Sequence, residues 1–252
     1  MVPKEFSLAG KKAVVGGLGQ SWQKEIASYL ADAGADVAVF GKNKEEMQAA
    51  MKSVEGLGRR AMTFTVDVTS PKEVASMVAE VVKNWQKIDI LVNSFNLPFA
   101  KPLPEISTAE WAKVIEANLT PVFVCCQAVG KHMLEKKGGK IITITSGLAE
   151  RGVPNGTAYC ASKGAVVQFT RALALEWARS DIRVNAIALG WMENSAETGK
   201  EEWRHMLVRY APLKRLARPD DFAAALVYLA SDASSFVTGS TFYITGGLMA
   251  HG

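Results

Sequence analysis

The fold is decided by Lys140-Ile141-Ile142-Thr143-Ile144-Thr145, a short β-rich apolar run followed by a stretch with helical spacing and then by a second apolar run at 183–188. Two such runs joined by a helix-length crossover are typical of a βαβ unit, in which the two strands run parallel. Helices then cover both faces of the sheet, which explains why the strands are almost continuously apolar.

The same alternation extends outward from this unit to both ends of the chain. Seven candidate strands result, at 12–16, 36–40, 61–66, 88–92, 140–145, 183–188 and 241–244. We expect one doubly wound, Rossmann-like α/β domain over residues 1–252, with seven parallel strands and three helices on each face.

Composition excludes several classes of protein. The 252 residues carry a net charge of only +4, without a run of five basic residues, which disfavours nucleic acid and anionic membranes as partners. No apolar stretch looks long enough to span a membrane and the N-terminus lacks a signal peptide, so we expect a cytoplasmic protein. The cysteines and histidines show no metal-ligand spacing, and we expect reduced core thiols and no metal site. The cysteines are Cys125, Cys126 and Cys160, and the histidines are His132, His205 and His251.

Ligands of doubly wound sheets bind beyond the carboxyl ends of the strands, where the sequence places candidate reactive groups. Tyr159 and Lys163 are four residues apart at the start of a helix and therefore share one face. An ammonium group beside a phenol favours the phenolate, which suits proton exchange near neutral pH. The alternative is an exposed helical pair without chemistry.

Two further polar residues stand out. Ser146 ends the strand at 140–145, where its hydroxyl can orient a substrate oxygen. Asn118 is a poor helix former within a helical stretch, and it bends the helix, binds water or marks a helix boundary before Pro121.

Together, Asn118, Ser146, Tyr159 and Lys163 resemble the catalytic tetrad of the short-chain dehydrogenase/reductase family, in its branch of about 250 residues. Asp67-Val68-Thr69 is similar to the family's adenine-contacting turn, and Ile88-Asp89-Ile90-Leu91-Val92-Asn93 to its fourth strand. The resemblance covers nearly the whole chain.

The resemblance implies a role for each residue of the tetrad. Tyr159 would be the general acid/base and Ser146 would orient the substrate oxygen. Lys163 would promote ionisation of Tyr159 and hold the nicotinamide ribose, and Asn118 would belong to a proton relay through water. The implied reaction is NAD(P)-linked interconversion of a secondary alcohol and a ketone.

The cofactor side departs from the family pattern. The family's TGxxxGxG aligns on 16–23, where Gly17 is kept and Ser21 and Gln23 replace the other two glycines. We expect the side chains of Ser21, Trp22 and Gln23 to occupy the pyrophosphate position. The family's NNAG aligns on Asn93-Ser94-Phe95-Asn96, PG appears as Leu189-Gly190, and Asn194 stands where a Thr is usual.

Phe95 is expected to narrow the adjoining ribose site. Lys42 after the second strand favours NADP over NAD, if a cofactor binds at all. The candidate cofactor-binding residues are Gly17, Ser21, Gln23, Lys42, Asp67, Val68, Asn93, Lys163 and Gly190.

Three hypotheses about function follow. The first is an oxidoreductase subunit that uses Tyr159, although its cofactor site is altered. The second is a pseudoenzyme subunit of a hetero-oligomer with a homologous catalytic chain, similar to non-catalytic subunits of the hydroxybenzylsuccinyl-CoA dehydrogenase type. The third is a protein that binds another small molecule in the same cleft.

Further residues bear on the substrate and on the assembly. Contacts with substrate are expected from Leu148, Arg151, Val153, Trp191, Met192 and the segment 193–213. Arg151, Lys200 and Lys214 favour an anionic substrate or a CoA thioester, unless they are ordinary surface charges. Helices within 111–133 and 158–177 are apolar over more than one face, which predicts a dimer or tetramer.

Overall fold

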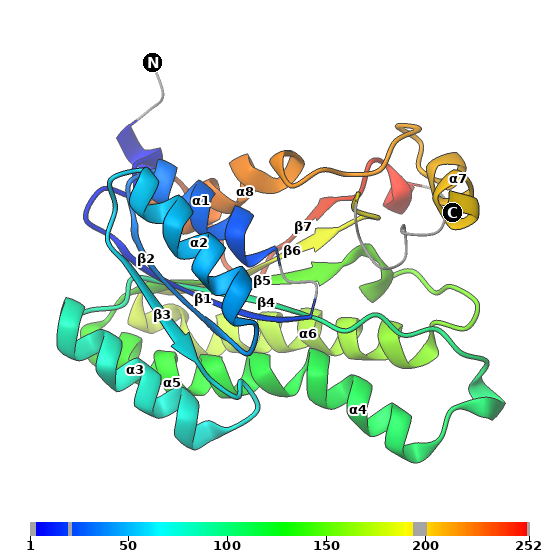
Figure 1. Cartoon of the computed structure of the whole chain (residues 1–252), viewed down its shortest axis with the longest axis horizontal. Helices are drawn as coiled ribbons and strands as arrows, with labels where there is room; N and C mark the ends of the chain where they lie inside the picture. Colours follow the sequence, from blue (N-terminus) through cyan, green and yellow to red (C-terminus); the bar gives the residue numbers. More distant parts are fainter. Residues whose placement is uncertain (1–3, 20–21, 194–200, 251–252) are drawn as a thin grey trace.

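All seven strands belong to one parallel sheet with the order β3-β2-β1-β4-β5-β6-β7 (Figure 1). The computed structural model describes residues 4–19, 22–193 and 201–250, without the side chains of 202 and 203, so Ser21, Asn194 and Lys200 lie outside the described residues. The strands are β1 Lys12–Gly19, β2 Asp36–Gly41, β3 Ala61–Thr65, β4 Ile90–Asn96, β5 Gly139–Ser146, β6 Ile182–Leu189 and β7 Thr241–Ile244.

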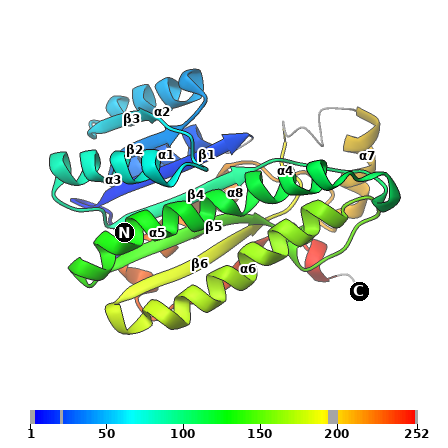
Figure 2. The same cartoon turned by 90° about the horizontal axis from the view of Figure 1, so that it is seen from below.

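Helices cover both faces of this sheet (Figures 1 and 2). One face carries α1 (Gln23–Asp32), α2 (Lys44–Gly56) and α8 (Asp220–Ala230). The other carries α3 (Pro71–Trp85), the consecutive pair α4 (Thr108–Asn118) and α5 (Thr120–Lys136), and α6 (Thr157–Trp177). The helix α7 (Glu201–Tyr210) lies beyond the carboxyl ends of the strands. The predicted doubly wound Rossmann-like domain is confirmed.

Two apolar cores, one on each side of the sheet, hold the layers together. Successive strand residues alternate between them: Val14 faces α3, α5 and α6, whereas Ala13 and Val15 face α1, α2 and α8. Burial on both faces accounts for the apolar runs in the sequence, because a strand with two covered faces has no solvent side.

The pair α4–α5 is broken between Asn118 and Thr120. Pro121 in the first turn of α5 has no amide hydrogen to donate to the preceding turn, so the two helices abut without merging. The span Thr108–Lys136 is long and apolar enough to cross a membrane by length and composition alone. The sequence-based expectation was that no apolar stretch is long enough to span a membrane, and this span differs from it. In the structure, Val122, Val129 and Met133 of this span are buried in the core beneath the sheet.

Two strands, β1 and β4, continue three or more residues past their predicted ends, and this matters for the site. β1 continues to Gly19 and β4 continues to Asn96, with Gly17 paired to Ser94 and Gly19 to Asn96. Phe95 and Asn96 are therefore strand residues rather than loop residues.

Candidate active site

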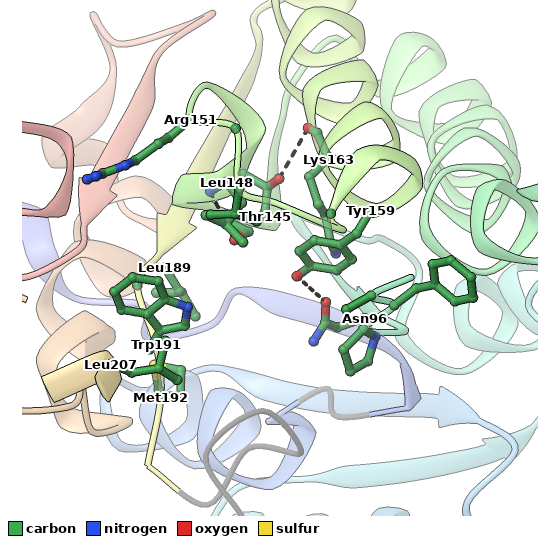
Figure 3. Close-up of a pocket in the computed structure, with 18 of the residues that line it drawn as sticks. Asn96, Thr145, Leu148, Arg151, Tyr159, Lys163, Leu189, Trp191, Met192 and Leu207 are labelled. Carbon is green, nitrogen blue, oxygen red and sulfur yellow. Dashed lines mark hydrogen bonds between the residues drawn. The ribbon is translucent and has the colours of Figure 1, made fainter. Parts of the chain in front are cut away.

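A cavity of about 750 Å³ opens at the carboxyl ends of β4, β5 and β6 (Figure 3). Its wall comes from the ends of these strands, the segment 151–156, the first turns of α6 and the helix α7. A cavity of this size and place is the usual form of a small-molecule site in a doubly wound sheet.

Tyr159 and Lys163 enter the cavity from α6 and are nearly buried, with exposed fractions of 7% and 2%. Their spacing of one helical turn places the Lys163 ammonium 5.5 Å from the centre of the Tyr159 ring. Lys163 Nζ donates a hydrogen bond to the Phe95 carbonyl at 2.8 Å, and the Tyr159 hydroxyl donates one to Asn96 Oδ1 at 2.8 Å. Both groups are therefore held by the end of β4.

Ser146 lines the same cavity at the end of β5. Its Oγ accepts a hydrogen bond from the Leu148 amide at 3.2 Å, which begins the short 3-10 turn Gly147–Ala149. The structure thus brings Ser146, Tyr159 and Lys163 to one place, from a strand end and a helix start that the sequence had marked separately.

Asn118 is fully buried at the end of α4 and is not among the residues that line the cavity. Its Oδ1 accepts a hydrogen bond from the Leu97 amide at 2.8 Å, and its Nδ2 donates to the Leu97 carbonyl at 3.0 Å and to Ser162 Oγ at 3.1 Å. Asn118 therefore lies at a helix boundary, which is one of the three alternatives that the sequence left open for it. Its side chain ties the helix end to the chain that leaves β4.

The side chain of Gln23 does not occupy the front of α1, as the sequence had led us to expect. It is 1% exposed, and its Nε2 donates hydrogen bonds to the carbonyls of Phe40 at 2.8 Å and of Val15 at 3.2 Å. Because a buried amide needs acceptors, it donates to these two strand carbonyls rather than to solvent. The expectation that Gln23 fills the pyrophosphate position was wrong.

The expectation for Phe95 was also wrong. Its ring is buried in the core with Phe40, and both rings lie so close to Gly16 that a Cβ there would come within 3 Å of them. Phe95 also lines the cavity, and its carbonyl accepts the Lys163 ammonium there. The neighbouring Asn96 reaches the site instead, through its bond with Tyr159. The sequence showed that an amide replaces a glycine here but gave no sign of this bond.

On the adenosine side, Lys42 after β2 and Asp67 after β3 form an ion pair at 2.8 Å. The hydrogen bond from Lys42, followed by those from Thr69, lowers the pKa of Asp67 to about 2. Val68 is fully buried in the core, contrary to its place among the candidate cofactor contacts. The structure thus leaves Lys42 and Asp67 as the accessible groups here.

Asn93 does not reach the cavity with its side chain, contrary to its place among the candidate cofactor contacts. It is fully buried, and its Nδ2 donates to Thr143 Oγ1 at 3.3 Å and to Cys126 Sγ at 3.5 Å. Its position in β4, two residues before Phe95, points it into the same core. Gly190 lines the cavity, and a Cβ there would lie 3.0 Å from the Thr245 backbone.

The substrate side is mainly apolar. Leu148, Val153, Trp191 and Met192 line the cavity as expected, with Trp191, Leu189, Met192 and Leu207 on the side opposite Tyr159 (Figure 3). Arg151 points away from Tyr159, and its Nη1 donates to the Leu248 carbonyl at 2.6 Å. Tyr210, from the expected segment 193–213, lines the cavity as well, and so do Trp22 and Phe99, which had not been predicted as substrate contacts.

Metal-ligating side chains do not gather anywhere in the described part of the chain: no three His, Cys, Asp or Glu groups come together there. Cys125 and Cys126 are free thiols that are fully buried, and burial raises the pKa of both, that of Cys126 to about 12. They pack as small apolar residues in the core beneath β4.

Comparison with known proteins identifies the family. Residues 17–249 match the family model described as enoyl-(acyl carrier protein) reductase. The chain belongs to the short-chain dehydrogenase/reductase family. Relatives in this family include the 3-oxoacyl-[acyl-carrier-protein] reductase of Chlamydia pneumoniae, 34% identical over 97% of this chain and 99% of that protein. Another is the gluconate 5-dehydrogenase of Gluconobacter oxydans, 33% identical over 98% of this chain and 97% of that protein.

Solved structures of the family superimpose over almost the full chain. The gluconate 5-dehydrogenase of Burkholderia cenocepacia, in complex with NADP and tartrate, has a TM-score of 0.92 at 32% identity and covers 99% of both chains. A xylitol dehydrogenase bound to NAD+ has a TM-score of 0.89 at 30% identity, over 95% of this chain and 99% of that one. The family therefore binds NAD(P) and interconverts alcohols and ketones.

Two side chains expected to obstruct a dinucleotide in this short-chain dehydrogenase/reductase chain are buried instead. Gln23 and Phe95 are turned into the core, so neither blocks the start of α1 or the end of β4. Lys163, Lys42 and Asp67 present charged groups along the carboxyl edge of β1 to β4. A helix N-terminus suits phosphate, and the carboxyl ends of the strands suit the rest of the ligand. Trp22, Ser94, Phe95 and Asn96 line the cavity near the start of α1 and the end of β4.

Proposed function

We propose that this chain is an NAD(P)-linked oxidoreductase that interconverts a secondary alcohol and a ketone at Tyr159. The observation that carries the proposal is the convergence of the Tyr159 hydroxyl, the Lys163 ammonium and the Ser146 hydroxyl on one cavity. A proton donor, a cation and an orienting hydroxyl at one point are what acid catalysis at a carbonyl oxygen requires.

In the direction of ketone reduction, the nicotinamide supplies the hydride to the carbonyl carbon. Tyr159 donates its proton to the carbonyl oxygen, and Ser146 hydrogen-bonds the same oxygen and fixes its position. The phenolate that remains is stabilised by the Lys163 ammonium, which is nearly buried and therefore weakly screened. In the oxidation direction the same groups act in reverse, with the tyrosinate as base.

The proposal assigns the cofactor contacts to four groups of residues. The phosphates would lie at the start of α1 beside Gly17, and the adenosine would lie against the paired side chains of Lys42 and Asp67. Lys163 would hold the nicotinamide ribose, and Gly190 would border the nicotinamide. A 2′-phosphate would have to compete with Asp67 for Lys42, since the two side chains are already paired.

The cavity favours a carbonyl compound with an apolar substituent over a polyol. Phe99, Leu148, Val153, Trp191 and Met192 contribute apolar side chains to the wall. Arg151 lines the cavity, but its side chain points away from Tyr159 and its Nη1 donates to the Leu248 carbonyl, so the cation is not directed at the reactive groups. A CoA thioester would be a substrate only with its acyl group inside the cavity and its charged part outside.

The test is an assay of the purified chain with NADH and with NADPH, against a panel of ketones. The panel contains an aryl alkyl ketone, a 3-oxoacyl-CoA and 5-ketogluconate. We expect reduction of the apolar ketones, and loss of turnover by at least a hundredfold in Tyr159→Phe, the usual scale of general acid catalysis. Tyr210→Phe is the matched control, because it removes another phenol from the same cavity. Full activity of Tyr159→Phe would refute the assignment.

The second candidate is the non-catalytic subunit of a hetero-oligomer. Trp22 favours this candidate. It adopts a left-handed backbone (φ 53°) at the start of α1, where the phosphates of a dinucleotide would lie, and it lines the cavity. A fluorescence titration in which neither NADH nor NADPH binds would support this candidate. Unchanged activity of a co-purified hetero-oligomer carrying Tyr159→Phe would support it further.

Assembly and location complete the proposal. Relatives are of the same length and fold, and the helices α4, α5 and α6 carry exposed apolar side chains on one face of the sheet. We propose a dimer or tetramer through this face, in the cytoplasm. A homologous catalytic chain is the partner required by the second candidate alone.

A further inference from the structure

Asn96, the last residue of β4, is aimed at the reactive hydroxyl of the site. Its Oδ1 accepts the hydrogen bond of the Tyr159 hydroxyl at 2.8 Å (Figure 3). This is the position at which the family pattern has a glycine, which has no side chain to make such a bond.

The backbone on both sides of Asn96 is held in place. Before it, the Phe95 carbonyl accepts the Lys163 ammonium at 2.8 Å. After it, Asn118 binds both the amide and the carbonyl of Leu97. Asn96 itself is paired with Gly19 of β1. The amide is thus presented to Tyr159 from a backbone with little freedom to withdraw.

The chemistry of this bond is specific to the protonated phenol. A phenol can donate to an amide oxygen, whereas a phenolate cannot. A hydrogen bond that only the neutral form can make stabilises that form. A ketone that receives the Tyr159 proton must first accept a hydrogen bond from the same hydrogen. Because this hydrogen points at one strong acceptor at a time, the ketone oxygen and the Asn96 amide oxygen compete for it.

We propose that Asn96 is a positioning residue that holds the proton on Tyr159 until the substrate oxygen displaces its amide oxygen. The identity of the displacing group rests on the proposed function, but the hold on the proton does not. Lys163 promotes loss of this proton and Asn96 opposes it, so the balance between them determines when Tyr159 ionises.

The test is an alkaline absorbance titration of tyrosinate formation on the full chain without cofactor. The contribution of Tyr159 is the difference between each chain and the same chain carrying Tyr159→Phe. We expect Asn96→Ala to lower the midpoint by about one pH unit, the scale of one hydrogen bond. Asn96→Asp should raise it, because a carboxylate is a stronger acceptor and a like charge opposes the phenolate.

The matched control is Asn155→Gly, which removes another amide from the cavity wall at a residue whose φ of 62° suits glycine. Its midpoint should equal that of the unchanged chain. Asn96→Gly provides a second loss of the bond should Asn96→Ala fail to fold by circular dichroism. Equal midpoints in the Asn96 variants and the unchanged chain overturn the inference.

Kinetics separate this inference from the proposed function. Asn96→Ala should lower KM for the ketone by about tenfold, because the substrate no longer competes with the amide. Shifted midpoints in a chain without NAD(P)-linked turnover would retain the role of Asn96 and reject the proposed function. Turnover that depends on Tyr159, combined with unshifted midpoints, would support the proposed function and reject the role of Asn96.

Discussion

The Gln23 side chain binds the Phe40 carbonyl at 2.8 Å, joining the first turn of α1 to the end of β2. A second bond from the same amide to Val15 fastens β1 as well. The family pattern has a glycine at position 23 because a helix must pack closely on the strand there. In this chain the close packing is replaced by two hydrogen bonds from a buried amide.

Removal of this amide should cost stability. Gln23→Ala leaves the Phe40 and Val15 carbonyls without this donor in a buried place, which costs about 1–3 kcal/mol of unfolding free energy. Chemical denaturation measures the change. Gln48→Ala, an exposed glutamine in α2, is the control and should change stability by less than about 0.5 kcal/mol. Equal stability of Gln23→Ala and the unchanged chain would contradict a structural role for the amide.

Cofactor selectivity should depend on Lys42. Lys42→Ala removes the cation that faces the proposed 2′-phosphate, and we expect the Kd for NADPH to rise about tenfold while that for NADH stays the same. Titration of intrinsic fluorescence with each dinucleotide measures both constants. Lys44→Ala, at the start of α2, removes a nearby exposed cation as the control. A parallel weakening of both dinucleotides would contradict this role.

Lys140 should react with acylating reagents at a lower pH than ordinary lysines. Burial, followed by the nearby Arg183, lowers the pKa of Lys140 to about 8. A much larger share of its amine is therefore neutral at pH 8 than the about 0.3% of a lysine of ordinary pKa. Its Nζ donates to Ser234 Oγ at 3.2 Å in a cleft at the amino ends of the strands.

Brief acetylation at pH 8 and peptide mass mapping test this expectation. Lys140 should be labelled faster than Lys72, an exposed lysine on α3, and the advantage should shrink as the pH rises above 10. Labelling at equal rates at pH 8 would show that the Lys140 amine is protonated or inaccessible.

Self-association should depend on the outer face of α6. Leu175 is 83% exposed there, and Phe123 of α5 and Trp111 of α4 add exposed apolar surface to the same side of the sheet. Leu175→Glu should shift the chain toward a smaller species in sedimentation velocity, because a buried unpaired carboxylate destabilises an interface. Leu57→Glu, on an exposed leucine after α2, should not. A stable monomer of the unchanged chain at micromolar concentration would refute the predicted assembly.

The sequence predicted the meeting of Tyr159, Lys163 and Ser146 because two simple rules determine it. Helical spacing places the first two on one face, and the parallel sheet brings strand ends and helix starts to one edge. The directions of Phe95 and Asn96 were not predicted, because the strand was expected to end at 92. Once β4 continues to Asn96, its alternation places Phe95 with Leu91 in the core below the sheet.

The direction of the Gln23 side chain was not predicted for a different reason. A glutamine in a turn has several rotamers, and its direction depends on which backbone carbonyls the neighbouring strands leave unpaired. Such carbonyls cannot be found before the register of β1 and β2 is known. The bond between Asn96 and Tyr159 is likewise a contact between residues 63 positions apart, which no local pattern contains.

The strand order also governs how this protein can be made in the cell. β1, β2 and β3 form the first part of the sheet within 65 residues. β4 then adds beside β1, and β5, β6 and β7 each add beside the strand before them. A nascent chain can therefore extend its sheet in the order of translation. Until synthesis is complete, the newest strand is an open apolar edge, which attracts other unfolded chains. The last strand, β7, is only four residues long and half-buried, so the finished protein presents a short edge on that side.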